Sequence, residues 1–86
     1  MNKRKLLARA LAGSKNMRFS EVVALAEAFG FRLSRVTGSH HIFAHPQVHE
    51  LVNLQQVGGK AKPYQIRQLL ALAEQYNLEL DTGDES

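Results

Sequence analysis

Gly38 and Ser39 separate two runs of residues that each have the character of a β-strand. The run before them, 31–37, alternates imperfectly between apolar and polar side chains, and the run after them, 40–45, begins with two histidines. A glycine and a serine between such runs are typical of a tight turn. We therefore predict an antiparallel hairpin, and a chain of 86 residues has few ways to arrange its remaining segments around one.

Helical periodicity is found on both sides of this hairpin. Apolar residues at helical spacing predict a short helix over 2–12, and a second helix that is capped by Ser20 and ends near Phe29. A third helix is predicted to begin at Pro63, because proline is favoured in a first turn, and Asn77 is suited to end it. The hairpin is therefore flanked by two helices before it and one after it.

Between the hairpin and the last helix, the pattern predicts one more strand. Pro46 cannot continue a β-ladder and is expected to begin a loop that contains His49 and Glu50. Residues 51–55 are predicted to form the third strand, and 56–62 a flexible basic loop. The fold class that follows is α+β: a three-stranded antiparallel sheet with helices on one face, plus an extra N-terminal helix.

We expect one domain, because a chain of this length supports a single small core. The domain is expected over 1–78, with its core in 20–78 and the helix over 2–12 as an accessory. Residues 79–86 hold four of the eight carboxylates and no lysine or arginine. We expect this acidic tail to be disordered.

The charge balance of the rest of the chain favours a polyanionic partner. Residues 1–78 contain eleven lysines and arginines but four carboxylates, which gives a net charge of +7. Such a basic body suits RNA, DNA or an acidic protein, although a merely soluble basic surface has the same composition. The chain has no run of eighteen apolar residues, so we expect no membrane contact and a cytoplasmic location.

Thiol and metal chemistry find little support in the sequence. The chain has no cysteine, which excludes disulfides, thiolate metal sites and a cysteine nucleophile. His41, His45 and His49 are spaced four apart, but Pro46 interrupts the helix that would bring them together. We therefore expect no metal and no cofactor, and structural roles for His45 and His49.

The phase of the second strand decides which histidine is available. Successive side chains of a strand point to opposite faces, so His40 and His41 have different surroundings. We place Ile42 on the face covered by helices, and His41, Phe43 and His45 on the open face. A slip of one residue would exchange the two adjacent histidines. In the predicted phase, His41 is an exposed imidazole beside an exposed aromatic ring.

A basic glycine turn supplies the second half of a candidate site. Residues 58–63 contain two glycines and two lysines before the last helix, where the positive end of the helix dipole disfavours cations. Such a segment is understandable if it binds a phosphate through main-chain N–H groups and lysines, although a flexible soluble loop has the same composition. The predicted RNA- and phosphate-binding residues are Lys60, Lys62, Arg35, Arg67, Gly59 and Phe43.

Together, the exposed histidine and the basic turn predict RNA cleavage without a metal. A histidine side chain titrates near neutral pH and can remove or supply a proton, and we assign His41 to this role. The ribose 2′-OH would attack the neighbouring phosphorus while cations stabilise the charge on the phosphoryl oxygens. One acid–base group contributes about 10²–10⁴-fold, so we expect a slow enzyme.

Three segments of the chain resemble the HicA family of toxins. They are Gly38-Ser39-His40-His41-Ile42-Phe43, Gly59-Lys60-Ala61-Lys62-Pro63 and Ile66-Arg67-Gln68-Leu69-Leu70, and the resemblance covers roughly residues 20–78. It implies a small mRNA interferase with a double-stranded-RNA-binding-domain-like fold, which cleaves mRNA independently of the ribosome and without a metal. It also implies a catalytic histidine that is the second residue after Gly-Ser, which falls on His41, and neutralisation by a HicB antitoxin that buries this histidine.

The chain departs from the family's pattern in two places. Many members have another histidine shortly before the glycine-lysine turn, where this chain has Leu54-Gln55-Gln56-Val57, and the shortest members lack the helix over 2–12. Two other functions therefore stay open. One is a non-catalytic RNA-binding module. The other is a protein-interaction module that recruits a partner through its N-terminal helix or an open sheet edge.

Overall fold

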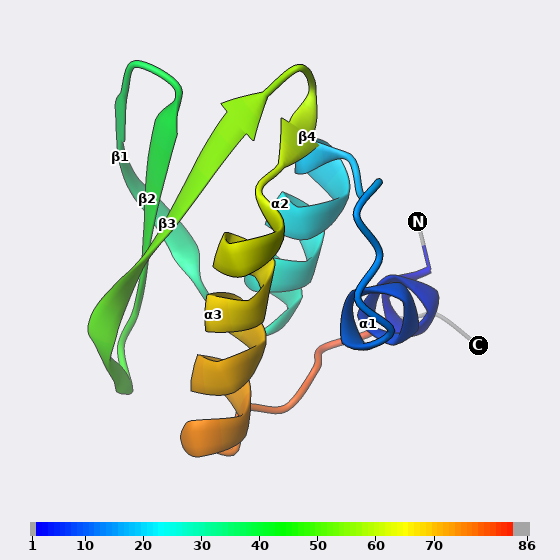
Figure 1. Ribbon diagram of the computed structural model, residues 1–86. Coiled ribbons are helices and arrows are strands. Elements are labelled where there is room, and N and C mark those ends of the chain that lie inside the picture. The colour runs from blue at the N-terminus through cyan, green and yellow to red at the C-terminus, as the bar shows by residue number, and fades with distance from the viewer. Residues whose placement is uncertain (1, 84–86) are drawn as a thin grey trace.

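The computed structural model describes residues 2–83, in which α2 and α3 pack on one face of an antiparallel sheet and α1 packs on these two helices (Figure 1). The helices are α1 (Lys3–Leu11), α2 (Phe19–Ala28) and α3 (Pro63–Gln75). The four strands, adjacent in chain order, are β1 (Arg32–Thr37), β2 (His40–His45), β3 (Val48–Val57) and β4 (Lys60–Ala61). The predicted α+β class is confirmed, and β4 is a short addition to the three strands that the sequence predicts.

The start of α2 differs from the sequence prediction. The sequence places the N-cap at Ser20, whereas the structure places it at Arg18. The Glu21 side chain accounts for the difference, because its Oε1 atom accepts the main-chain N–H of Arg18 at 2.9 Å. This bond satisfies a donor at the helix end that no main-chain group can reach. The carboxylate therefore outweighs the higher intrinsic preference of serine for the cap position.

Helix α3 begins and ends as the sequence predicts. Pro63 occupies its first turn, where the missing N–H costs no hydrogen bond. At the other end, Asn77 has a positive φ of 52°, and its N–H donates to the Glu74 carbonyl at 3.1 Å. The next N–H, of Leu78, donates to the Ala73 carbonyl at 2.9 Å. These two bonds close the last turn, with asparagine in the position that glycine usually takes.

The predicted phase of β2 is wrong by one residue. Phe43 is 1% exposed and faces the helices, paired with Val52 of β3, whereas Ile42 lies on the open face. His41 and His45 share the helix side with Phe43, so neither stands on the open face. The aromatic ring takes the core position because it buries more apolar surface than isoleucine. The core joins this face of the sheet to all three helices and includes Leu6, Met17, Val22, Leu25, Phe31, Phe43, Val52, Leu54 and Leu69.

A β-bulge in β1 explains the imperfect alternation of that strand. Arg32 and Leu33 pair with β2 in one register and Arg35 and Val36 in a register shifted by one residue, which leaves Ser34 extra. Arg32 and Arg35 consequently share the open face, and Leu33 and Val36 share the helix side. In an unbroken strand, residues three apart would lie on opposite faces.

Two predicted loops are parts of hairpins instead. The turn between β2 and β3 takes two residues, so His49 and Glu50 belong to β3 rather than to a loop. The basic segment 56–62 forms the end of β3, a turn and β4. Gly58 and Gly59 make that turn with φ values of 57° and 76°, which glycine adopts without the strain that another residue would carry.

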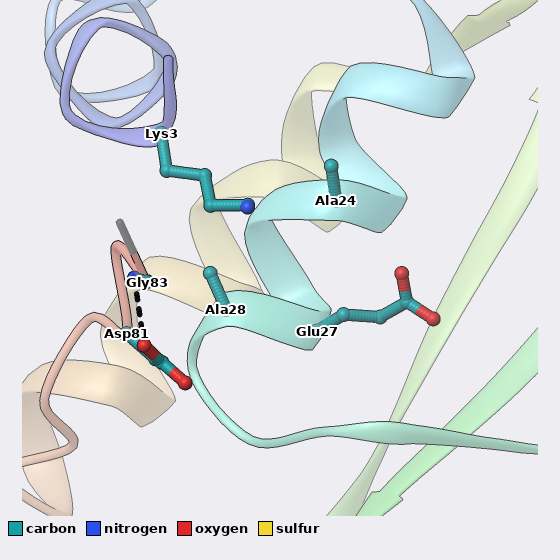
Figure 2. A pocket seen from close by; sticks show the side chains of 6 residues that line it. All are labelled: Lys3, Ala24, Glu27, Ala28, Asp81 and Gly83. Carbon is teal, nitrogen blue, oxygen red and sulfur yellow. Dashed lines mark hydrogen bonds between the residues drawn. The ribbon is translucent and has the colours of Figure 1, made fainter. Parts of the chain in front are cut away.

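The acidic tail has a defined path over the part that the structure describes. Leu80 packs against the core, and the main-chain N–H of Asp81 donates to the Ala28 carbonyl at 2.8 Å. Figure 2 shows the open pocket that Asp81 and Ala28 line at this contact. The sequence predicts disorder here, whereas the structure places 79–83 against the helices. Residues 84–86 lie outside the described part of the chain.

Gly30 lies where the chain passes from α2 to β1, in contact with His45. Its φ is +100°, which L side chains rarely adopt, and a Cβ atom added there would lie 2.7 Å from Nε2 of His45. The imidazole has little room to move away. It packs edge-on against the Phe31 ring, and its Nδ1 accepts the Gln47 N–H at 3.0 Å.

We predict that Gly30→Ala lowers the unfolding free energy by about 2–3 kcal/mol, measured by urea denaturation, because it combines backbone strain with a displaced ring. Gly13→Ala is the matched control: Gly13 also has a positive φ, of 80°, but nothing lies within 4 Å of an added Cβ. That variant should lose about 1 kcal/mol, from backbone strain alone. Equal losses in the two variants would show that the His45 contact contributes nothing.

Candidate nucleic-acid interface

The turn between β1 and β2 holds His41 in a defined orientation. Gly38 makes the turn with a φ of 60°, and the next residue, Ser39, has its carbonyl oxygen 3.1 Å from Nδ1 of His41. Because a carbonyl oxygen can only accept, Nδ1 carries the hydrogen in this bond. The other ring nitrogen, Nε2, is then the atom that can accept a proton from a ligand when the ring is neutral.

The ring of His41 rests on Phe19, the first residue of α2. The two ring centroids are 4.7 Å apart with their planes inclined at 56°. Phe19 is buried, and its main-chain N–H donates to the Gly59 carbonyl at 2.9 Å. One residue thus connects the histidine, the start of a helix and the glycine turn. His41 is half-buried on the helix side, close to the start of β2.

His40 is oriented on the opposite face of the sheet. Its Nδ1 lies 3.1 Å from Oδ1 of Asn53 on the neighbouring strand β3. In the sheet it lies between Thr37 of β1 and Gln55 of β3. An amide oxygen as acceptor again puts the hydrogen on Nδ1 and leaves Nε2 available. The tip therefore presents two imidazoles with the same tautomer, one on each face.

Two cations lie beside Phe19: the predicted Lys60 at the start of β4, and Arg18 at the N-cap of α2, which the sequence did not predict. Nζ of Lys60 donates to Oδ1 of Asn16 at 3.3 Å, and Lys60 forms an isolated β-bridge with Arg18. Both cations are exposed next to the first turn of α2, where the helix dipole adds positive potential. This corner of the molecule can attract a phosphate group.

Lys62 lies at the N-cap of α3 and has an aromatic neighbour. Its Nζ is 6.0 Å from the centroid of the Tyr64 ring, which is 54% exposed. The sequence predicts an exposed aromatic ring at Phe43, whereas in the structure an exposed ring lies at Tyr64, beside Lys62. An exposed ring of this kind can stack on a nucleic-acid base.

The structure divides the single basic patch that the sequence predicts. Phe43 is buried in the core and cannot contact RNA. Arg35 lies on the open face of β1, and Arg67 lines an apolar groove between α1 and α3. The residues that do come together at the start of α2 are His41, Phe19, Gly59, Lys60 and Arg18.

Two further residues that fix the geometry of the sheet were missed by sequence reasoning. Gln65 is 2% exposed, and its Oε1 accepts the main-chain N–H of Gln55 at 2.7 Å, which ties the first turn of α3 to β3. Asn53 orients His40. Polar residues in a helix and a strand normally face water, so neither gave a signal in the pattern. Only the pairing of strands and helices in space identifies them.

The described residues hold neither a metal-binding cluster nor a membrane-spanning helix. Among residues 2–83, no group of three or more histidine, aspartate or glutamate side chains is placed to hold a metal ion. Within the same part of the chain, no helix is long and apolar enough to cross a membrane.

Glu21 links α1 to the start of α2. Its Oε2 lies 2.7 Å from Nη1 of Arg9 on α1, while Oε1 accepts the Arg18 N–H. The hydrogen bond from the Arg18 main chain, helped by Arg9, holds the pKa of the Glu21 carboxyl below its ordinary value of 4.5, and partial burial opposes the shift. The ionised carboxylate is therefore the form that the folded state favours.

Comparison with known proteins gives one family. A family model described as HicA toxin of bacterial toxin-antitoxin matches residues 19–75, which span α2, the whole sheet and α3. Helix α1 and the segment after α3 lie outside the match. No curated protein matches the chain.

We predict that Glu21→Gln lowers the unfolding free energy by about 0.5–1 kcal/mol at pH 7, a modest loss because the pair is partly exposed and screened by solvent. A carboxyl group with a depressed folded-state pKa stabilises above its unfolded pKa, and this contribution is lost as pH falls through the folded value. The difference between wild type and variant, measured by urea denaturation, should therefore disappear as pH falls below about 4.5.

Glu74→Gln is the control for this prediction, since Glu74 is an exposed glutamate with no salt bridge in the described part of the chain. Its replacement should change stability little at either pH. A Glu21→Gln deficit that persists unchanged at pH 3 would contradict the assignment to the ionised carboxylate.

Proposed function

The chain belongs to the HicA toxin family, and on that premise we propose that it is an endoribonuclease that cleaves mRNA in the cytoplasm and is neutralised by a HicB-like antitoxin. Family membership supports the toxin class and a toxin–antitoxin partnership. The cleavage chemistry and its residues are inferred from the site described above.

The observation that carries the proposal is the orientation of His41 beside a basic turn. The Ser39 carbonyl fixes the hydrogen on Nδ1, so Nε2 is the available base. Through Phe19, the same ring is connected to Gly59, the residue before Lys60. An oriented acid–base group next to cations can support cleavage of RNA without a metal ion.

In the proposed reaction, Nε2 of His41 takes the proton of a ribose 2′-OH, and the 2′-oxygen attacks the adjacent phosphorus. The bond from phosphorus to the 5′-oxygen breaks, and that oxygen takes a proton from water or from the imidazolium. The products are a 2′,3′-cyclic phosphate and a 5′-hydroxyl. Lys60 and Arg18 stabilise the negative charge that grows on the phosphoryl oxygens, and no cofactor takes part.

Other contacts are assigned by their positions around this centre. Lys62, with the exposed Tyr64 ring, is proposed to bind the RNA chain on the side of α3. Arg35 lies on the open face, where His40 is oriented by Asn53. Because the two histidines face opposite ways, they cannot act on the same phosphate, and the open face is the competing location for the chemistry.

We predict that His41→Ala abolishes RNA cleavage by purified protein in EDTA, with a loss of at least about 10²-fold in rate. Fragments from the wild type should carry 2′,3′-cyclic phosphate or 3′-phosphate ends. His40→Ala is the matched control, one residue away on the opposite face, and should retain cleavage.

The reciprocal result, with activity lost in His40→Ala and kept in His41→Ala, would transfer the acid–base role to the open face. Cleavage that survives both substitutions would refute histidine chemistry. A wild-type protein that binds RNA without cutting it, in EDTA and in magnesium, would identify a non-catalytic RNA-binding module instead.

We predict that Lys60→Ala weakens binding to single-stranded RNA and reduces its salt dependence. Each phosphate contact contributes about 0.7 to the slope of log K against log salt, so the slope should fall by about that amount. Lys5→Ala, an exposed lysine of α1, should leave the slope unchanged. Equal slopes in all three proteins, measured by fluorescence anisotropy, would remove Lys60 from the interface.

A further inference from the structure

The two edges of the sheet differ in how far their main chain is covered. On the β3 side, β4 pairs with the strand end, the Gln65 side chain accepts the Gln55 N–H, and the Tyr76 hydroxyl donates to Glu50 at 2.6 Å. On the other side, all of β1 is exposed, and no strand of residues 2–83 pairs with its outer edge (Figure 1). Unpaired N–H and C=O groups in this arrangement can bind another extended chain.

The bulge at Ser34 gives this edge two chemically different faces. Leu33 and Val36 lie on the helix side and are 50% and 51% exposed, although Phe43, Val52 and Leu54 are buried on the same side of the neighbouring strands. On the open face, the side chain of Arg35 makes no hydrogen bond or ion pair with any of the described residues. Arg32 donates to two main-chain carbonyls and keeps its positive charge.

We propose that the outer edge of β1 binds an extended strand of the antitoxin whose side chains are acidic on one face and apolar on the other. The main-chain groups of β1 would pair with that strand. Its acidic residues would lie next to Arg32 and Arg35, and its apolar residues would cover Leu33 and Val36. This inference rests on the antitoxin partnership proposed above and assigns a surface to it.

Charge argues against a second copy of this chain as the occupant. If the β1 strands of two copies paired edge to edge in an antiparallel manner, their open faces would form one continuous surface. Arg32 and Arg35 of both copies would then lie next to each other on that surface. Like charges in cross-strand positions destabilise a sheet, and the side-chain hydrogen bonds here offer no carboxylate to offset them. An acidic strand meets the same residues with favourable electrostatics.

The location of this edge places the bound strand close to the hairpin tip that carries His41. Val36 is the cross-strand neighbour of His41, and Thr37 that of His40. A strand added to β1 lies about 10 Å from β2, two strand spacings away. The body of an antitoxin that carries such a strand would therefore stand beside the hairpin tip and block RNA from reaching it.

The test uses the full-length protein and a defined probe, a short peptide of alternating glutamate and valine. Titration into ¹⁵N-labelled protein should shift the β1 amide signals and slow their hydrogen exchange. Leu33→Lys should weaken this binding by at least about tenfold, because the added charge disrupts the apolar side of the edge. Leu51→Lys is the matched control: Leu51 is 49% exposed but lies on β3, and binding should be unchanged.

A second pair of variants keeps the test independent of any one substitution. Val36→Lys should weaken binding because Val36 lies on β1. Val57→Lys should not, because Val57 lies on β3 and pairs with β4 on the other side of the sheet, although both valines are 51% exposed. Thermal unfolding of each variant verifies that it is folded. Three results would overturn the proposal: peptide signals that map away from β1, equal binding of a lysine–valine peptide, or a wild-type dimer that Leu33→Lys dissociates.

RNA cleavage measured on the same samples separates this inference from the proposed enzyme function. Leu33→Lys should cleave RNA at the wild-type rate while failing to bind the acidic peptide. A wild-type protein that binds the peptide at β1 but does not cleave RNA would refute the nuclease proposal and leave the edge assignment intact.

Discussion

The contact of Phe19 with Gly59 and His41 is the interaction on which the arrangement of this molecule depends. The main-chain N–H of Phe19 satisfies the Gly59 carbonyl, and the ring of the same residue supports the imidazole of His41. The start of α2, the β3–β4 turn and the β1–β2 tip are thereby joined at one point. A small domain has little core to position its functional groups, so a contact shared by three segments has a large effect.

Helix α1 reinforces this contact from outside the residues that match the family model. Arg9 of α1 pairs with Glu21, whose carboxylate also fixes the Arg18 N–H immediately before Phe19. Helix α1 is therefore linked to the position of the imidazole through Glu21, Arg18 and Phe19. A helix that the family match does not include thus contributes to the geometry of a site that the match does include.

The sequence predicted the elements well and the faces poorly, for reasons that particular residues make clear. Ile42 and Phe43 are adjacent and both apolar, so alternation alone cannot say which one enters the core. The choice is made by Val52 and Leu54 on the neighbouring strand, which only tertiary pairing brings next to Phe43 and His41. Likewise, the extra residue Ser34 interrupts the two-residue alternation of β1. Imperfect alternation in the sequence does not reveal which residue is the extra one.

The residues of the candidate site were also predictable only in part. The Gly-Ser-His-His tip and the glycine-lysine turn were recognisable because turns require particular residues at fixed spacing. The roles of Phe19, Asn53 and Arg18 were not, because each acts through a partner distant in sequence. Phe43 illustrates the effect of a wrong phase: a residue predicted to contact RNA is buried in the core, and an exposed aromatic ring is found instead at Tyr64 on α3.

Because His40 and His41 are adjacent on one strand, they lie on opposite faces of the sheet, and the surrounding residues differ between the two faces. Only one face of the tip can meet a given phosphate, and the helix-side face has the Lys60 and Arg18 cations while the open face has Asn53 and Arg35. The bulge then allows the outer strand to present its arginines on one side and its apolar residues on the other. Chemistry at the tip and recognition along the edge can therefore be governed by different residues of the same hairpin.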